Sequence, residues 1–343
     1  MNKVYAAAPE EDIVLSSRVR LARNYNDIPF SPKMTSDQSQ ETIRRAATRI
    51  AESDQVNFYR LYYLSGLSEN ERRRMLEKQF ISNDLLSNAE NAAVLISVGE
   101  TVSIMLNEED HLRILGLLPG EQLDKAAQLA FQADDLLGGG ETFAFDPKWG
   151  YLTACPTNAG TGMRASVQMH LPALAHARKM SPVAQAAGKL GFTLRGMYGD
   201  NGESEGNIFQ LSNQATMGRT EEDVLKNLIA VCAQIADQER EERKREIELD
   251  ADSFADKMMR SVGILLNARL LDLKEFMRLY SDLRFAAGVG LLAAPIAGID
   301  EMMRLVQPGA LEELAGAPLS ERDSLLLRAS EVRSRLSTLI DDK

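Results

Sequence analysis

The sequence Asn107-Glu108-Glu109-Asp110-His111-Leu112-Arg113 decides the interpretation of this chain, because three carboxylates directly precede a histidine and an arginine. It follows an apolar run, 92–106, that is rich in β-branched residues and is interrupted by Gly99-Glu100. That pattern is typical of two strands joined by a tight turn. We therefore expect the acidic triplet at the end of a strand, where alternate side chains point to opposite faces. Glu109 is predicted to face one way, and Glu108 and Asp110 the other.

Three adjacent carboxylates repel one another unless cations or a metal ion offset their charge. One interpretation is therefore a functional cluster. The alternative is a solvated strand end or the first turn of a helix, where acidic residues are favourable. The triplet alone leaves both interpretations open.

Length and composition set the class of protein. The chain has 343 residues, of which 44% are hydrophobic and 26% charged, so we expect two globular domains with a sizeable core. The formal net charge of −11 excludes a general binder of nucleic acid or of anionic membranes. Local clusters of arginine are informative because they oppose this acidic average.

The compartment is predicted from cysteine usage and the absence of targeting segments. Cys155 and Cys232 are too few for a disulfide framework. The first residues lack the apolar region of a signal peptide, and no apolar run reaches the length of a membrane span. We expect a soluble, cytoplasmic protein.

Residues 13–23 alternate apolar and polar side chains, which predicts a strand. Arg18 and Arg20 are two residues apart and therefore share one face of it. Two neighbouring guanidinium groups favour an anion between them. The alternative is an edge strand protected by its charge.

Two later segments also carry isolated arginines. In 150–171 a short predicted strand leads into a loop of small residues that contains Gly160 and Gly162, and Arg164 follows. Such loops can cradle phosphates. This loop lacks the spacing of a Walker A loop. Residues 192–198, with Arg195, and 207–213 are predicted strands, and the acidic loop 199–206 joins them as a lid-like hairpin.

Helices are predicted for 35–52, 68–80, 120–137 and 220–249, with Ser68 and Thr220 as N-caps. We interpret the run 72–74, three arginines, as a solvated helix face. Beyond about residue 250 the helical period continues almost throughout, with breaks near 288–295, 308–309 and 318.

Five motifs of the chain, and the order in which they occur, resemble those of the ATP:guanido phosphotransferases, the family of the creatine and arginine kinases. They are Ser16-Ser17-Arg18-Val19-Arg20, the segment 107–113, Cys155-Pro156-Thr157-Asn158 with 160–167, Arg195-Gly196 and Ser212-Asn213-Gln214. The layout resembles the bacterial protein arginine kinases. The resemblance implies an α+β fold: a catalytic domain over 10–240, with a large, mainly antiparallel sheet flanked by helices, and an all-α C-terminal domain over 250–343.

The resemblance also implies ATP and Mg²⁺ as cofactors and a set of nucleotide-binding residues. The five phosphate-binding arginines would be Arg18, Arg20, Arg113, Arg164 and Arg195. Further contacts are implied at Ser17, Val19, His111, Ala165, Ser166, Val167, Gln168, Gly196, Met197, Tyr198, Gly199 and Asp200. We add the hypothesis that Glu108 and Asp110 orient magnesium-bound waters.

For the acceptor, the resemblance implies that Glu109 aligns the guanidinium and takes its proton. Arginine kinases carry a second carboxylate, a glutamate, at the position held here by Asp200; Glu203 and Glu205 on the same loop are alternatives for that role. Cys155 matches the family's reactive cysteine beside the guanidinium. Its alternative role is that of a small buried hydrophobe.

The C-terminal region departs from the family. Bacterial protein arginine kinases carry an Arg-Asp-x-x-Arg-Ala motif that binds phosphoarginine allosterically, but here two extra residues separate Arg322-Asp323 from Arg328-Ala329. In one α-helix this insertion turns Arg328 by roughly 200°. The departure argues against allosteric binding of phosphoarginine.

The function predicted from the sequence is phosphorylation of arginine residues in proteins. Implied partners are protein substrates with exposed arginines and components of chaperone and protease systems in protein quality control, with a homodimer as the assembly. The alternatives are a phosphagen kinase for free arginine or another small guanidine, and a catalytically impaired adaptor that binds nucleotide.

Overall fold

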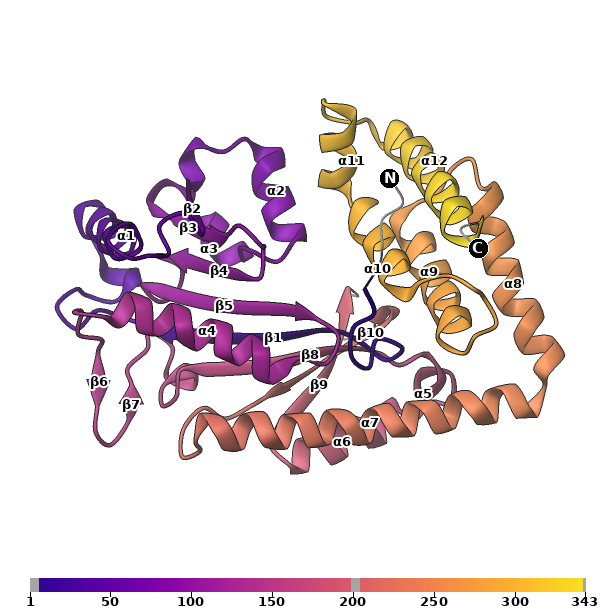
Figure 1. The fold of residues 1–343 in the computed structure, drawn as a ribbon, viewed down its shortest axis with the longest axis horizontal. Coiled ribbons are helices and arrows are strands. Elements are labelled where there is room, and N and C mark those ends of the chain that lie inside the picture. Colours follow the sequence, from indigo (N-terminus) through magenta and orange to yellow (C-terminus); the bar gives the residue numbers. More distant parts are fainter. Residues whose placement is uncertain (1–5, 199–203, 342–343) are drawn as a thin grey trace.

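Residues 6–198 and 204–341 are described in a computed structural model of the chain, drawn as a ribbon in Figure 1. Eight strands form one sheet in the order β2-β3-β4-β5-β1-β8-β10-β9, and all neighbouring strands are antiparallel. Their bounds are β1 Val14–Arg23, β2 Tyr59–Tyr63, β3 Ala93–Ser97, β4 Val102–Leu106, β5 Leu112–Pro119, β8 Met163–His170, β9 Phe192–Tyr198 and β10 Ser204–Asn213. The large antiparallel sheet expected from the sequence is confirmed.

Two turns shape the middle of the sheet. The predicted turn at Gly99-Glu100 joins β3 to β4, and Glu100 has a positive φ of 56°. Only Asn107 separates the acidic triplet from the end of β4, so its position at a strand end is confirmed. Strand alternation does not apply there, because residues 107–111 form the turn into β5 and Asn107 has a φ of 64°.

Helices cover the sheet on its apolar face. Val19 of β1, Ala165 and Val167 of β8 and Ile114 of β5 are fully buried in one hydrophobic cluster. Helix α4 packs on β1, β5 and β8, helix α7 packs on β8 and β10, and helix α6 packs on β9. The helices of this part are α1 Ser36–Ala51, α2 Glu69–Glu77, α3 Asn83–Ser87, α4 Leu123–Gly138, α5 Pro172–His176, α6 Met180–Lys189 and α7 Glu221–Leu249. A separate hairpin consists of β6 Phe145–Asp146 and β7 Gly150–Tyr151.

The helix starts predicted at Ser68 and Thr220 are confirmed by their caps, whereas the helix predicted from residue 120 begins at Leu123. The Ser68 side chain accepts a hydrogen bond from the Glu71 amide, and the Glu71 side chain bonds back to the Ser68 amide. Thr220 accepts from the Asp223 amide at the start of α7. Helix α2 ends at Glu77, three residues before the predicted end, and the chain then adopts a positive φ of 62° at Gln79.

The C-terminal region is all helical, as expected. Its helices are α8 Ala251–Asn267, α9 Leu273–Gly288, α10 Ile296–Leu305, α11 Pro308–Ala315 and α12 Glu321–Asp341. Figure 1 shows them at one end of the sheet, beside β10 and the start of β1. They enclose a second hydrophobic cluster, in which Phe276, Tyr280 and Leu283 of α9 are fully buried.

Two buried arginines join this helical region to the sheet. Arg284 of α9 donates to the carbonyl oxygens of Glu11 at 2.6 Å and Asp12 at 3.0 Å, just before β1. Arg243 of α7 donates to the same Asp12 carbonyl at 3.2 Å. Both side chains are almost fully buried, so the segment that leads into β1 is held by helices from both parts of the chain.

The interpretation of 72–74 as a solvated face is wrong for two of its arginines. Arg73 pairs with Glu312 at 3.2 Å, and Arg74 pairs with Glu313 at 2.7 Å, both on α11. The Arg74 side chain is only 12% exposed. The run contacts a helix more than 200 residues away in the sequence, which local periodicity does not reveal.

Within residues 6–198 and 204–341, no helix is both long and apolar enough to cross a membrane.

Candidate active site

Antiparallel register places the predicted arginines on one face of the sheet. Residues directly opposite each other on antiparallel strands point to the same face. Arg20 of β1 lies opposite Arg164 of β8, and Ala22 lies opposite Arg113 of β5. Arg18 shares this face with Arg20, since two residues separate them on one strand.

Arg195 joins them through two further pairings. It lies opposite Gln210 of β10, which lies opposite Gln168 of β8. We call this face, with Arg18, Arg20, Arg113, Arg164 and Arg195, the arginine face. It is the opposite face from the core beneath α4 and α7.

The arginine face is electrostatically strained. Burial lowers the pKa of Arg20 to about 9, and repulsion by Arg113 and Arg18 adds to this effect. The pKa of Arg18 is lowered to about 10, first by burial and then by Arg113. The pKa of Arg164 is also lowered, by burial and by Arg195. A bound anion would relieve this repulsion, so the face favours a polyanionic ligand.

Four residues with implied nucleotide contacts lie on the sheet face opposite the arginines. Ser17 and Val19 alternate with the arginines of β1, and Ala165 and Val167 alternate with Arg164 on β8. All four are buried in or beside the core, and the Ser17 hydroxyl donates to the Gly120 carbonyl at 2.9 Å. Their side chains therefore point away from the arginine face, and the nucleotide contacts implied at these positions stay predictions.

The remaining nucleotide predictions divide between both faces. Ser166 and Gln168 lie on the arginine face, and Gln168 accepts a hydrogen bond from Ser16 at 3.2 Å. Gly196 lies opposite Phe209, on the other face from Arg195. Met197 packs against the cluster of the C-terminal helices. Tyr198 is the last residue of β9, and Gly199, Asp200 and Glu203 lie outside the described residues.

Glu108 is a buried anchor within the acidic turn. Its Oε1 accepts from the Ser82 hydroxyl at 2.6 Å and pairs with the Arg113 guanidinium, and its Oε2 accepts from the Glu109 amide at 2.6 Å. Burial opposes its ionisation, but Arg113 and the hydrogen bonds outweigh burial, so the pKa of Glu108 lies below its ordinary value. Glu108 thus holds an arginine of the arginine face in place.

Asp110 is a second buried anchor. It is 2% exposed, and its Oδ1 accepts from the Asn24 side chain at 2.7 Å and from the Ala154 amide at 2.8 Å. These bonds tie the acidic turn to the end of β1 and to the segment that carries Cys155.

His111 has a structural position behind the turn. Its Nδ1 accepts from the Tyr25 amide at 3.0 Å, so its Nε2 donates to the Pro29 carbonyl at 2.8 Å. The ring is fully buried, and burial lowers the pKa of His111. Both ring nitrogens therefore bind the main chain, and the nucleotide contact implied at His111 stays a prediction.

Glu109 is the accessible carboxylate of the triplet. It is half-buried, and its Oε2 accepts from the Asn158 side chain at 3.3 Å. The Asn158 oxygen accepts from Arg20 at 3.4 Å, so one amide joins Glu109 to the arginine face. Asn158 was not among the predicted site residues. Its place in the Cys-Pro-Thr-Asn motif was the available signal.

Cys155 lies beside these groups on the loop that follows β7. It is half-buried, and its Sγ lies 3.1 Å from the Thr157 hydroxyl. The glycines that follow Cys155 allow the main chain to pack closely. At Gly160, whose φ is 109°, the Cβ of any other residue would lie 2.3 Å from the Thr216 carbonyl oxygen. The small residues of this loop therefore allow close contact with protein main chain, a role the sequence did not predict.

No group of three or more His, Cys, Asp or Glu side chains within the described ranges is arranged to hold a metal ion. Of the loop carboxylates proposed to hold the guanidinium, Glu205 is described and lies near the start of β10.

Arg328 of α12 is buried and donates to the carbonyls of Val306 and Leu271, at 3.0 and 3.1 Å. Its guanidinium therefore stabilises the helical region from within.

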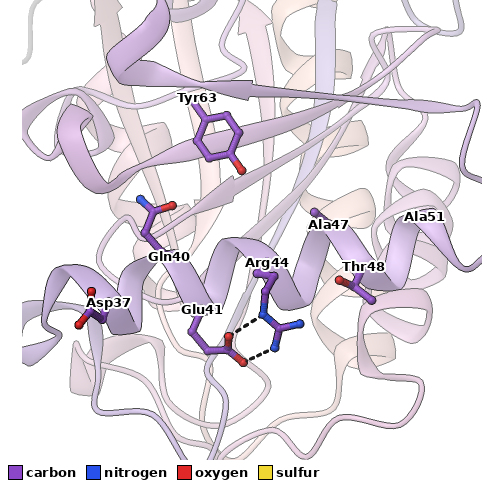
Figure 2. A pocket seen from close by; sticks show the side chains of 8 residues that line it. All are labelled: Asp37, Gln40, Glu41, Arg44, Ala47, Thr48, Ala51 and Tyr63. Carbon is purple, nitrogen blue, oxygen red and sulfur yellow. Dashed lines mark hydrogen bonds and ion pairs between the residues drawn. The ribbon is translucent and has the colours of Figure 1, made fainter.

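A hollow of about 600 Å³ lies elsewhere, along α1 (Figure 2). Asp37, Glu41 and Arg44 line it with Tyr63 of β2, and Glu41 and Arg44 pair with each other. None of the predicted site residues lines it.

Comparison with known proteins gives consistent results over nearly the whole chain. Residues 39–242 match the ATP:guanido phosphotransferase C-terminal catalytic domain, and residues 251–343 match the Protein-arginine kinase McsB C-terminal domain. Among relatives, a protein-arginine kinase of Halalkalibacterium halodurans is 42% identical over 96% of this chain and 93% of its own. One from Bacillus subtilis is 39% identical over 98% and 93%.

Solved structures share the fold of about two thirds of the chain. A taurocyamine kinase from Schistosoma mansoni with bound components of a transition state analog has a TM-score of 0.60 and 27% identity, and covers 68% of this chain and 34% of its own. A lombricine kinase has a TM-score of 0.59 and 24% identity, and covers 67% of each chain.

Proposed function

Because the chain belongs to the ATP:guanido phosphotransferase family and is similar over nearly its full length to protein-arginine kinases, we propose that it transfers the γ-phosphoryl group of ATP to arginine residues of proteins. The observation that carries this proposal is the arginine face, with Glu109 at its edge. It offers a cationic surface for phosphates beside one accessible carboxylate for the acceptor.

The arginine face is the proposed site of the triphosphate. Phosphoryl transfer depends mainly on in-line positioning and on neutralising the charge of the phosphates. Guanidinium groups stay charged and form bidentate contacts with phosphate oxygens. Burial, and then repulsion by Arg113, lowers the pKa values of Arg18 and Arg20, and a bound phosphate would offset that repulsion, which supports this assignment.

Mg²⁺ is the expected partner of ATP and would neutralise part of its phosphate charge when bound. Glu108 and Asp110 already accept hydrogen bonds from protein donors, which does not fit direct coordination. Contact through metal-bound water stays a hypothesis. Combining Glu108→Gln with Asp110→Asn should raise the magnesium requirement, and an unchanged magnesium titration would refute the hypothesis.

Glu109 is the proposed orienting base for the guanidinium. Complete proton transfer before phosphorylation is implausible, because reference pKa values of 13.8 for arginine and 4.3 for glutamate differ by roughly 9.5 units, or about 13 kcal/mol. That cost alone would limit turnover to ~10³ s⁻¹. Proton removal should therefore be late, or concerted with formation of the P–N bond.

We also propose which other residues contact the acceptor guanidinium. Asp200 is the first choice for the second carboxylate, with Glu203 and Glu205 as alternatives. Cys155 lies beside the Glu109 and Asn158 contact and is proposed to border the guanidinium rather than to act as a nucleophile.

The physiological setting is a further part of the proposal. We propose protein substrates with exposed arginines, chaperone and protease components as partners in protein quality control, a cytoplasmic location and a homodimeric assembly. A protein acceptor is favoured over a small guanidine because the relatives named protein-arginine kinase match the helical region as well as the sheet.

The test supplies γ-labelled Mg-ATP with an unfolded, arginine-rich protein and free arginine in parallel, and products are analysed at neutral pH because the P–N bond is acid-labile. Label on protein arginine supports the proposal. Label on free arginine alone would establish a phosphagen kinase, and label on neither, with nucleotide still bound, would favour the adaptor.

A further inference from the structure

Asn24 occupies a buried position between three segments of the site. It follows the last residue of β1 and is 1% exposed. Its Oδ1 accepts from the His111 amide at 2.9 Å, and its Nδ2 donates to Asp110 Oδ1 at 2.7 Å and to the Leu152 carbonyl at 3.1 Å. Both ends of the amide are therefore in use.

These bonds join the acidic turn to the segment that precedes Cys155. Asp110 and His111 belong to the turn, and Leu152 lies three residues before the cysteine. A second bond supports the junction, because Asp110 Oδ1 also accepts from the Ala154 amide at 2.8 Å. We call Asn24, Asp110 and the main chain of Leu152 and Ala154 the Asn24 clamp.

Each partner in the clamp is adjacent to a group of the candidate site. Asp110 directly follows Glu109, and Ala154 directly precedes Cys155. The Cys155 loop returns to the turn at Asn158, which contacts Glu109 at 3.3 Å. The clamp therefore closes a ring of contacts that fixes Glu109 relative to Cys155.

The charge at position 110 fits this role. A buried carboxylate needs hydrogen-bond donors, and Asn24 and Ala154 supply two. Removing the Asn24 amide would leave the His111 amide and the Leu152 carbonyl without this partner in a buried setting.

We propose that Asn24 and Asp110 are positioning residues that set the spacing between Glu109 and the Cys155 loop, and so align the acceptor guanidinium. The inference rests on the proposed function for its catalytic consequence. Neither residue needs to touch the substrate, since both act through Glu109 and the loop.

The test compares Asn24→Ala with wild-type full-length chain well below the unfolding temperature. Misplacement of reacting groups by about 1 Å costs about 10²-fold in rate, so kcat should fall by about that factor, while the Kd for ATP changes less than about threefold. Asp110→Ala should behave similarly, and it serves as the second variant if Asn24→Ala does not fold. Asp110→Asn retains an oxygen that accepts both bonds and should recover much of the loss.

A second readout is independent of turnover. Alkylation of Cys155 by iodoacetamide should be faster in Asn24→Ala, because the preceding segment is released. The matched control is Ser261→Ala in α8, which removes one buried hydrogen bond, to Asp282 at 2.7 Å, far from the site. The control should leave both kcat and the alkylation rate unchanged.

The outcomes separate this inference from the proposed function. If wild-type chain transfers phosphate and folded Asn24→Ala keeps kcat and the alkylation rate within twofold, the clamp has no positioning role. If wild-type chain transfers no phosphate, the proposed function fails, and the alkylation rates alone decide whether the clamp holds the loop.

Discussion

The side-chain amide of Asn158 donates to Oε2 of Glu109 at 3.3 Å. The same amide accepts from Arg20 at 3.4 Å. In the proposed reaction this residue joins the phosphate side of the site to the acceptor side. A change at Asn158 should therefore affect alignment more than binding of either substrate.

Asn158→Ala should lower kcat about tenfold, the effect of losing a hydrogen bond worth about 1.5 kcal/mol. The Kd for ATP should stay nearly constant, because the arginines of the face remain. Steady-state kinetics with a protein acceptor, together with nucleotide titration, measures both. An equal loss in ATP affinity and turnover would show that Asn158 supports nucleotide binding instead.

Asp200→Asn should reduce turnover by about 10²-fold or more if Asp200 is the second carboxylate that holds the guanidinium. Glu205→Gln is the matched variant at the start of β10 and should have a small effect. Rates at saturating ATP compare the two. Near-normal activity of Asp200→Asn with a loss in Glu205→Gln would transfer the role to Glu205.

The buried His170 should make the fold sensitive to acid. Burial, followed by the neighbouring cations Arg284 and Arg243, keeps the pKa of His170 well below 6.5. Below pH 6.5 the unfolded chain binds a proton that the folded chain excludes, so the free energy of unfolding falls as the pH falls, by up to about 1.4 kcal/mol per pH unit.

Urea unfolding of wild type and His170→Gln between pH 7.5 and 5.5 measures this contribution. The variant should lose less stability over that range than wild type. Identical slopes for wild type and His170→Gln would contradict the assignment.

Arg284→Met should destabilise the sheet as well as the helical region. Arg284 is fully buried, donates to the Glu11 and Asp12 carbonyls and pairs with Asp300 at 2.9 Å. Removing one partner of a buried ion pair costs about 3–5 kcal/mol.

Thermal unfolding followed by circular dichroism and by loss of ATP binding should show one shared transition at a lower temperature in Arg284→Met. The exposed pair of Arg260 with Asp256 provides a control, since Arg260→Ala should change stability by less than about 0.5 kcal/mol. Loss of the helical signal with ATP binding retained would mean that the two parts are independent.

Local sequence rules predicted the elements and part of the site. Alternation placed Arg18 and Arg20 on one face, and N-cap residues marked the starts of α2 and α7. Ser17 and Val19, where the resemblance implied contacts, alternate with these arginines and are buried on the core face. The pattern along a strand is local, so it is readable without the fold.

The pairing register between strands that are distant in the sequence cannot be predicted from local patterns. That Arg113, Arg164 and Arg195 share the face of Arg20 depends on the strand order and on pairings across the sheet. Asn24 lies outside every motif and gains its contacts only when the acidic turn and the Cys155 segment meet. The pairs of Arg73 and Arg74 with α11 likewise require the tertiary arrangement.

The central claim is that Glu109, alone in the acidic triplet, acts on the acceptor, while its neighbours hold the turn. The most direct measurement is phosphoarginine formation on a protein acceptor by wild type and Glu109→Gln, with the Kd for ATP determined in parallel. We predict a loss in kcat of about 10²–10⁴-fold with little change in ATP affinity. Turnover close to wild type in Glu109→Gln would contradict the account.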